Sequence, residues 1–445
     1  MKALATGLAV AAVGVGIFWD GGFDATPQWA FAATAVVAGL AALAARRAAW
    51  SAPVIVLLAI AALQALSAAW TIVPVADTLR AAALTAGYAA LVLAGSGQAA
   101  GRVAALLAGA AGITGLMGLV SASLYSSVYA ERVEGGWRPE GPFGYPPSLA
   151  LVQVFALPAV LTAMARARPG VAALAAIGAA TSGGVLVLVA NRFTLALAIV
   201  VLGIAVALSR RRLVAGSAAA FVAVAAVAFR LLLGGFTSRF SQAGPGAAFA
   251  VLALLAALAL LWMLVRQQIG ATDLDRRLGA RPALAAGIVI VAVAVLAGLF
   301  STGALSARRF DSHQGFTHGR TWMWSAAYRT ALERPGEGFG AASFFRASLS
   351  RQPGHGRVTR FAHDLPLEQW VETGIAGLLL ALAFYVACAR ALWRARDSPA
   401  LWLLGPAVAV FLLANLVDWP WHLAGVGALF AVALGSVTAA RTPRP

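Results

Sequence analysis

The chain has 445 residues, of which 61% are hydrophobic and 11% are charged, and its mean hydropathy is +0.85. Soluble domains are roughly half apolar and a quarter charged, so this composition excludes an ordinary water-soluble fold and favours a membrane protein. The formal charge of +17 would suit a nucleic-acid partner, but no RNA-recognition motif or zinc-ligand spacing accompanies it, and arginine also collects beside membrane helices. We expect membrane lipids as partners and no nucleic acid.

About 14 apolar segments follow one another along the chain, with lengths that suit helices crossing a bilayer. A transmembrane barrel would instead show alternating apolar and polar residues. The sequence therefore predicts an all-α polytopic membrane protein with about 12–14 transmembrane helices, the first of them retained rather than cleaved as a signal peptide. The expected spans are 3–19, 28–45, 53–70, 81–97, 103–122, 148–165, 170–190, 193–209, 213–233, 246–265, 283–302, 373–392, 399–416 and 423–440.

Arginine is concentrated in alternate connections, such as Arg46-Arg47 and Arg210-Arg211-Arg212. Short basic loops mark the cytoplasmic side, so an even number of helices places both termini in the cytoplasm. The longest periplasmic connection is then 303–372. We predict N-terminal membrane helices over 1–302, a periplasmic loop subdomain with the catalytic site over 303–372, and C-terminal membrane helices over 373–445.

The connection 303–372 is rich in aromatic residues, which favours a packed segment over a disordered one. Trp322 and Trp324 would stack on sugar rings or anchor the loop at the membrane interface. The Gly-Pro-rich stretch 334–340 predicts a turn that allows close backbone approach, and it lacks the Gly-Lys-Ser/Thr of a nucleotide-binding loop.

The side that we assign as periplasmic carries more arginine than topology requires. Arginine binds phosphate through paired hydrogen bonds, so the surplus indicates an anionic substrate. Lipid phosphates, or ion pairs with residues such as Glu131 and Glu333, explain individual arginines equally well. We expect Arg138 and Arg360 among those that bind substrate. The set is Arg132, Arg138, Arg192, Arg230, Arg239, Arg308, Arg309, Arg320, Arg329, Arg334, Arg346, Arg351, Arg357 and Arg360, with Arg80 near an interface.

Arg192 lies between two long apolar segments with almost no loop. A charge so close to the hydrocarbon is costly, so it favours a functional role over simple extension of the side chain to the lipid headgroups. His363 directly precedes a predicted helix that carries Glu368. Histidine accepts a proton from a hydroxyl near neutral pH, and Asp364 and Glu368 would orient it or compete with it as base. A lone histidine is also often structural.

Four stretches resemble the O-antigen ligase and O-antigen polymerase superfamily, which has a GT-C-like membrane architecture. The first is Ser67-Ala68-Ala69-Trp70-Thr71 with Pro74 and Thr78-Leu79, and the second is Arg138-Pro139-Glu140-Gly141-Pro142-Phe143-Gly144. The third is Arg192 followed by Leu195. The fourth and most specific runs from Arg320 to Trp324, through the turn at 335–340, to His363, Leu367-Glu368-Gln369-Trp370, Glu372, Gly374 and Gly377.

The resemblance implies a glycosyltransferase that takes its glycan from a polyprenyl (undecaprenyl) diphosphate donor. Arg192 and Arg320 would bind the diphosphate, His363 would act as base, and neither a metal nor another cofactor would be needed. The acceptor would be lipid A-core, the growing glycan, or a protein hydroxyl as in the oligosaccharyltransferases of the same superfamily. A flippase for lipid-linked oligosaccharides is the alternative from another class, but it favours charges at mid-helix.

Overall fold

The computed structural model describes residues 2–133, 136–208, 212–233, 244–271, 320–354 and 358–440. Within these ranges nine helices are long and apolar enough to cross a membrane, and four shorter apolar helices accompany them. One short antiparallel hairpin, β1 (Ala130–Val133) and β2 (Gly136–Pro139), is the β structure that the described residues contain. The predicted all-α polytopic membrane fold is therefore confirmed. The predicted span 283–302 lies outside the described residues.

The chain forms two compact units. The first contains Met1–Val103 and Phe310–Pro445, and the second contains Ala104–Arg309. The first unit thus combines helices from both ends of the chain, and we describe each unit by itself. The domain boundaries that we predicted at 302 and 372 were based on the position of the long connection in the sequence and not on helix packing. They stay a prediction.

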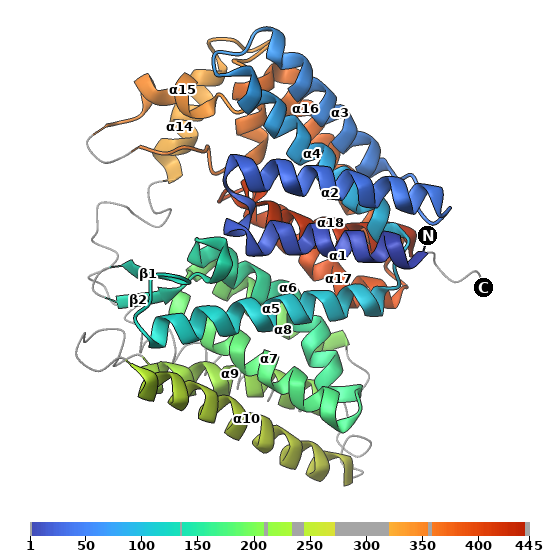
Figure 1. The fold of residues 1–445 in the computed structure, drawn as a ribbon, viewed down its shortest axis with the longest axis vertical. Helices are drawn as coiled ribbons and strands as arrows, with labels where there is room; N and C mark the ends of the chain where they lie inside the picture. Colours follow the sequence, from blue (N-terminus) through green and yellow to red (C-terminus); the bar gives the residue numbers. More distant parts are fainter. Residues whose placement is uncertain are drawn as a thin grey trace. The chain divides into compact units, whose positions relative to one another are not determined.

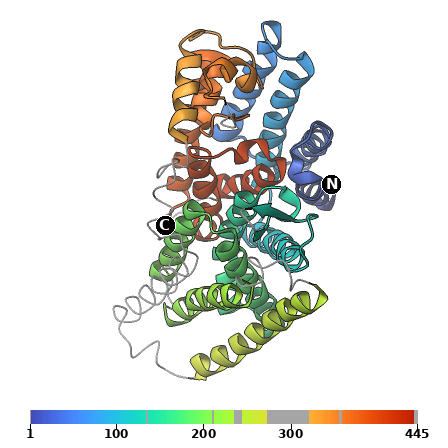
Figure 2. The ribbon, with the colours of Figure 1, turned by 90° about the vertical axis from the view of Figure 1, so that its left-hand side faces the viewer.

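The first unit places its N-terminal helices beside the last ones (Figure 1). Figure 2 shows the same unit from the side, with α16 in orange next to α3 in blue. The helices are α1 (Lys2–Phe18), α2 (Ala25–Ala44), α3 (Ala52–Leu66), α4 (Val75–Ser96), α14 (Arg320–Ala331), α15 (Phe344–Ser348), α16 (Leu365–Arg394), α17 (Pro399–Ala414) and α18 (Ala424–Ala439), with the 3-10 turns η1 (Asp20–Gly22), η2 (Ser67–Ala69), η4 (Leu349–Arg351) and η5 (Pro420–His422).

Helix α4 is the central helix of this unit, because it packs against α2, α3 and α18. Its Tyr88 is fully buried and donates a hydrogen bond from its hydroxyl to the carbonyl of Trp421 at 2.8 Å. The buried polar group is thereby satisfied, as a low-dielectric interior requires. This contact ties the middle of α4 to η5, which is one side of the candidate site.

The connection between α14 and α16 docks on α16 through the backbone. Phe339 N donates to Val371 O at 3.0 Å, Gly340 N donates to Glu372 O at 2.7 Å, and Ile375 N donates to Pro335 O at 2.8 Å. Phe339 and Phe344 pack in a buried cluster with Val371 of α16. The described part of the aromatic-rich connection is packed, and α16 begins before the span that we predicted at 373–392.

Helix α16 also presents apolar side chains outward beyond the docking region. Leu379, Leu382 and Val386 are 58%, 46% and 51% exposed. Large exposed aliphatic residues along one helix are costly in water and favourable against acyl chains. This face therefore agrees with a helix that crosses a membrane.

The second unit contains the remaining helices and the hairpin. Its helix α7 packs so closely on α9 that a Cβ on Gly183 would lie 2.5 Å from the carbonyl oxygen of Val222. Buried Gln153 of α6 links its helix to α5 and α7, since it donates to Ala111 O at 3.1 Å and accepts from Ser182 Oγ at 3.0 Å. The helices are α5 (Ala100–Ser123), α6 (Pro146–Arg166), α7 (Pro169–Val189), α8 (Arg192–Leu208), α9 (Arg212–Leu233) and α10 (Pro245–Ala271), with the 3-10 turn η3 (Gly141–Phe143).

Candidate functional site

His363 lies two residues before the start of α16, next to the turn between α17 and α18. Its side chain is 14% exposed, and its Nδ1 lies 3.3 Å from Oδ1 of Asp418. The contact lacks the geometry of a hydrogen bond, and Nδ1 is buried with no other hydrogen-bond partner among the described residues. The contact therefore places a carboxylate directly beside the imidazole of His363.

Asp418 also connects His363 to Arg320, the first residue of α14. Nη2 of Arg320 lies 3.8 Å from Oδ2 of Asp418, and Nε of Arg320 donates to the carbonyl of Val417. Two of the predicted catalytic residues are thus brought to the same carboxylate. That carboxylate was not among the predicted site residues, and its side chain is 11% exposed.

The backbone around His363 is held by the elements that flank it. Nε1 of Trp324, on α14, donates to the carbonyl of His363 at 3.3 Å. Asp364 is the N-cap of α16, because its side chain accepts a hydrogen bond from Leu367 N at 2.9 Å. Burial raises the pKa of Asp364 to about 6, with a smaller contribution from the charge of Glu368. Trp322 lies on α14 and is partly exposed.

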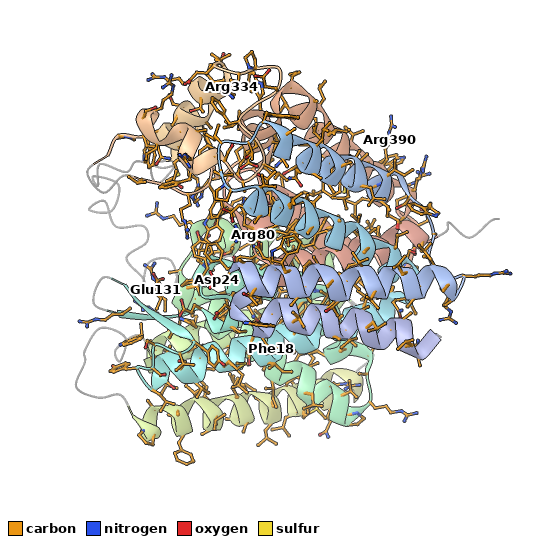
Figure 3. All side chains as sticks on the ribbon, turned by 45° about the horizontal axis from the view of Figure 1, so that its top comes forward. Phe18, Asp24, Arg80, Glu131, Arg334 and Arg390 are labelled. Carbon is orange, nitrogen blue, oxygen red and sulfur yellow. The ribbon has the colours of Figure 1, made fainter. Side chains whose placement is uncertain are left out.

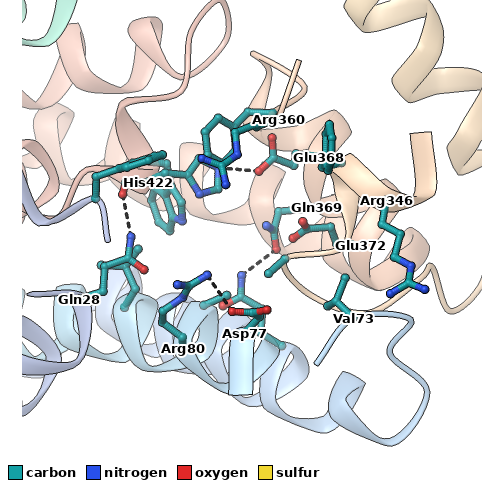
Figure 4. A pocket seen from close by; sticks show the side chains of 18 of the residues that line it. Gln28, Val73, Asp77, Arg80, Arg346, Arg360, Glu368, Gln369, Glu372 and His422 are labelled. Carbon is teal, nitrogen blue, oxygen red and sulfur yellow. Dashed lines mark hydrogen bonds and ion pairs between the residues drawn. The ribbon is translucent and has the colours of Figure 1, made fainter. Parts of the chain in front are cut away.

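A cavity of about 310 Å³ lies next to this segment in the first unit, and Arg360, Phe361 and Glu368 line it (Figure 4). Its other walls come from the start of α2, from α3 and α4, from α15 and from η5. The remaining lining residues are Phe23, Asp24, Gln28, Gln64, Val73, Asp77, Arg80, Ala81, Leu84, Ala342, Phe345, Arg346, Gln369, Glu372, Trp421 and His422.

A second histidine–carboxylate pair lies at the wall of the cavity. Nε2 of His422 is 2.6 Å from Oε1 of Glu368, whose other oxygen accepts a hydrogen bond from Ala362 N at 2.8 Å. The imidazole of His422 stacks on Phe361, with the ring centroids 4.0 Å apart and the planes 19° from parallel. Glu368 therefore orients His422 in this structure, whereas the carboxylate that contacts His363 is Asp418.

The two pairs join the same two segments, and each segment supplies the histidine of one pair and the carboxylate of the other. The segment before and within α16 supplies His363 and Glu368, and the turn before α18 supplies Asp418 and His422. Leu365 N adds a backbone hydrogen bond to Asn415 O at 2.8 Å. The result is a polar site between α14, α16 and η5, held by ion pairs and hydrogen bonds.

The other two predicted site residues belong to the second unit. Arg192 is the first residue of α8, and Asn191 caps that helix by accepting a hydrogen bond from Thr194 N at 3.0 Å. Helix α7 ends at Val189, so the tight turn that we expected is present. Arg138 lies on β2 opposite Glu131. Their part in substrate binding stays a prediction, and four arginines of the predicted set lie outside the described residues: Arg239, Arg308, Arg309 and Arg357.

Sequence reasoning missed Asp418 and the pairing of His422 with Glu368. A signal was present, since Asp418-Trp419-Pro420-Trp421-His422 places charged and aromatic residues between two apolar helices. The described residues contain no group of three His, Cys, Asp or Glu side chains arranged to hold a metal ion.

Comparison with known families adds an independent observation. Residues 243–382 match the model of a family described as O-antigen ligase. This segment of the chain is similar to the O-antigen ligase family. The match confirms the superfamily that the sequence motifs indicate, and no curated protein matches the chain significantly.

The matched segment includes Arg320, His363 and Glu368. Asp418 and His422 lie beyond its end, although they complete both histidine pairs. Together with the membrane helices of the described residues, the match indicates a multi-pass membrane protein and supports the O-antigen ligase or polymerase type.

Proposed function

We propose that the protein is a membrane glycosyltransferase that moves a glycan from a polyprenyl-diphosphate donor to an acceptor hydroxyl. The observation that carries this proposal is the group of His363, Asp418 and Arg320, which combines a candidate base, a carboxylate beside it and a guanidinium. A flippase needs no such group at the end of a helix, so the arrangement favours transfer.

In the proposed reaction, Nε2 of His363 takes the proton from the acceptor hydroxyl. The acceptor oxygen forms a bond to the anomeric carbon of the donor, while the bond from that carbon to the diphosphate oxygen breaks. The diphosphate leaves with the electron pair. Asp418 stabilises the imidazolium that forms, and Arg320 with Arg192 stabilises the negative charge that grows on the leaving diphosphate.

The proposal places the protein in a bacterial inner membrane, with both termini in the cytoplasm and the site at the periplasmic face. The donor is an undecaprenyl-diphosphate-linked glycan, and the acceptor is lipid A-core or the growing glycan. A protein hydroxyl is the alternative acceptor. Because guanidinium groups supply the positive charge, the reaction proceeds without a metal, and we expect transfer to persist in EDTA.

The test uses purified full-length protein in lipid nanodiscs with the donor and each acceptor class. Because general base catalysis contributes about 10²–10⁴-fold, His363→Ala should lower kcat by about that factor, and Arg320→Ala and Arg192→Ala should also reduce transfer. Asp418→Asn should lower kcat less, since the base remains. Arg390→Ala is the matched control, because Arg390 is exposed on α16 after the apolar face.

Size-exclusion profiles of all variants separate loss of activity from loss of folding. Full transfer by folded His363→Ala protein would reject the base assignment. Flipping of labelled donor without acceptor, together with no transfer to any acceptor, would reject the glycosyltransferase in favour of a transporter.

A further inference from the structure

Three carboxylates of the cavity lining are already engaged within the protein. Asp77 pairs with Arg80, with Oδ1 of Asp77 3.1 Å from Nη2 of Arg80. Glu368 holds His422, and Glu372 accepts a hydrogen bond from Phe344 N at 3.2 Å. Their negative charge is therefore balanced or fixed by local donors and does not define the ligand by itself.

Two arginines of the same cavity are differently placed. Arg346 and Arg360 are exposed residues that line the cavity, so they lie where it opens. Among the residues that the structure describes, neither forms an ion pair, and Arg360 lies with its Cζ 5.8 Å above the ring of Phe23. The side chain of Asp77 is 40% exposed but is paired with Arg80. Beyond that pair, the two arginines outnumber the exposed carboxylate of Asp24 and leave the opening with excess positive charge.

Hydrogen-bonding atoms remain available deeper in the cavity. Oε1 of Gln369 accepts from Gln64 Nε2 at 3.3 Å, while Nε2 of Gln369 makes no hydrogen bond to the described residues. The same holds for Nδ1 of His422, whose Nε2 is taken by Glu368. The aromatic rings of Trp421 and of Phe361, which stacks on His422 and Trp419, also line the cavity. Amide and imidazole donors or acceptors beside aromatic rings suit the hydroxyl groups and the apolar face of a sugar ring.

The size of the cavity limits the ligand. A volume of about 310 Å³ is at the lower end of the ~300–1,000 Å³ of small-molecule sites, which leaves room for one or two sugar rings and not for a long glycan. Phe361 lines the cavity and lies two positions before His363, so a ring bound there would be next to the segment of the proposed base.

We propose that this cavity binds a pyranose ring of the acceptor that carries a carboxylate, with His422 and Gln369 on its hydroxyls and Arg346 and Arg360 on its carboxylate. That the bound sugar belongs to the acceptor rests on the proposed function. Binding of the acidic sugar itself is measurable without transfer. A bidentate guanidinium–carboxylate contact gives both charge and geometric selection.

The first experiment measures binding by saturation-transfer NMR on the full chain in nanodiscs, with no donor present. The probes are methyl β-glucuronide, methyl β-glucoside and inorganic phosphate. We expect the glucuronide to bind about tenfold more tightly than the glucoside, since a charge-assisted hydrogen bond contributes about that factor. Equal binding of glucuronide and glucoside, or displacement of the glucuronide by equimolar phosphate, would overturn the assignment.

The second experiment uses variants of the lining. Arg360→Gln, Arg346→Gln and His422→Phe should each weaken glucuronide binding, and Ala81→Leu should block it by filling the cavity from α4 without removing a polar group. Arg390→Gln is the control, because Arg390 is not among the residues that line the cavity and Figure 3 shows it apart from Arg80, which is one of them. Unchanged glucuronide binding in folded Ala81→Leu protein would place the sugar elsewhere and reject the proposal.

Kinetics separate this inference from the proposed function. With an acidic acceptor, Arg360→Gln should raise the acceptor KM and leave kcat near its original value, whereas His363→Ala lowers kcat. Glucuronide binding without any transfer would reject the proposed function and retain the sugar site. Transfer without glucuronide binding would reject the sugar site and retain the proposed function.

Discussion

His363 adopts a backbone conformation that side chains seldom occupy. Its φ angle is +56°, in the left-handed region, which costs about 1–3 kcal/mol for a residue other than glycine. Contacts on both sides hold it there: Trp324 donates to its carbonyl, and Ala362 N donates to Glu368. Glu368 therefore has a positioning role for His363 as well as its contact with His422.

Asp364 gives a pH dependence of stability at this position. Burial raises the pKa of Asp364 to about 6 in the folded protein, above the ordinary value of 3.8. The folded state keeps the proton that the unfolded state has already lost, so stability is greatest below pH 3.8 and falls as the pH rises to about 6. We expect Asp364→Asn, which retains a cap, to remove this contribution.

The measurement is the thermal unfolding midpoint at several pH values between 4 and 7 for both proteins, a range that brackets the raised pKa of about 6. The unfolding midpoint of Asp364→Asn should rise relative to that of the original protein as the pH rises through this range. Parallel curves would contradict the buried carboxyl. Asp397→Asn, at an exposed position after α16, is the control that should follow the original protein.

At the scale of single elements, the break inside α16 decides where the site lies. Thr373 and Gly374 leave helical geometry within α16, with Gly374 at φ +68° and ψ −164°. A Cβ on Gly374 would lie 2.0 Å from the carbonyl oxygen of Gly336. The break exposes backbone groups that bind the 335–340 turn, and so it holds the connection against the start of α16.

Gly374→Ala should therefore destabilise the protein by about 2 kcal/mol or more, because its backbone conformation is essentially confined to glycine and the added methyl group collides with the turn. The measurement is the unfolding midpoint in detergent. Gly336→Ala is a matched control on the opposite side of the same contact, since a Cβ there meets nothing within 4 Å. Equal midpoints for the two variants would show that the close contact does not exist.

At the scale of the whole chain, one helix crossing joins the two ends of the sequence. Gly95 of α4 and Gly435 of α18 let their helices approach, since a Cβ on Gly435 would lie 2.2 Å from the carbonyl oxygen of Val92. Small residues at such crossings provide close packing where lipid supplies no hydrophobic drive between helices. Because α18 follows η5, this crossing also positions Asp418 and His422.

We expect Gly435→Val to separate α4 from α18, lower the unfolding midpoint and reduce the yield of monodisperse protein. Gly7→Val is the control, because it adds the same apolar group on exposed α1, where a Cβ meets nothing within 4 Å. A midpoint for Gly435→Val as high as that of Gly7→Val would contradict the crossing.

The sequence alone determined the helical membrane fold and the tight turn before Arg192, and it pointed to His363 as a candidate. These features depend on local information: hydrophobic length against bilayer thickness, and residue type beside a helix end. Only the tertiary structure decided the partners of the two histidines. Glu368 and His422 are 54 residues apart, and such pairings arise from helix packing, which leaves no periodic signal in the sequence. The cavity follows from the same packing, because its walls come from both ends of the chain.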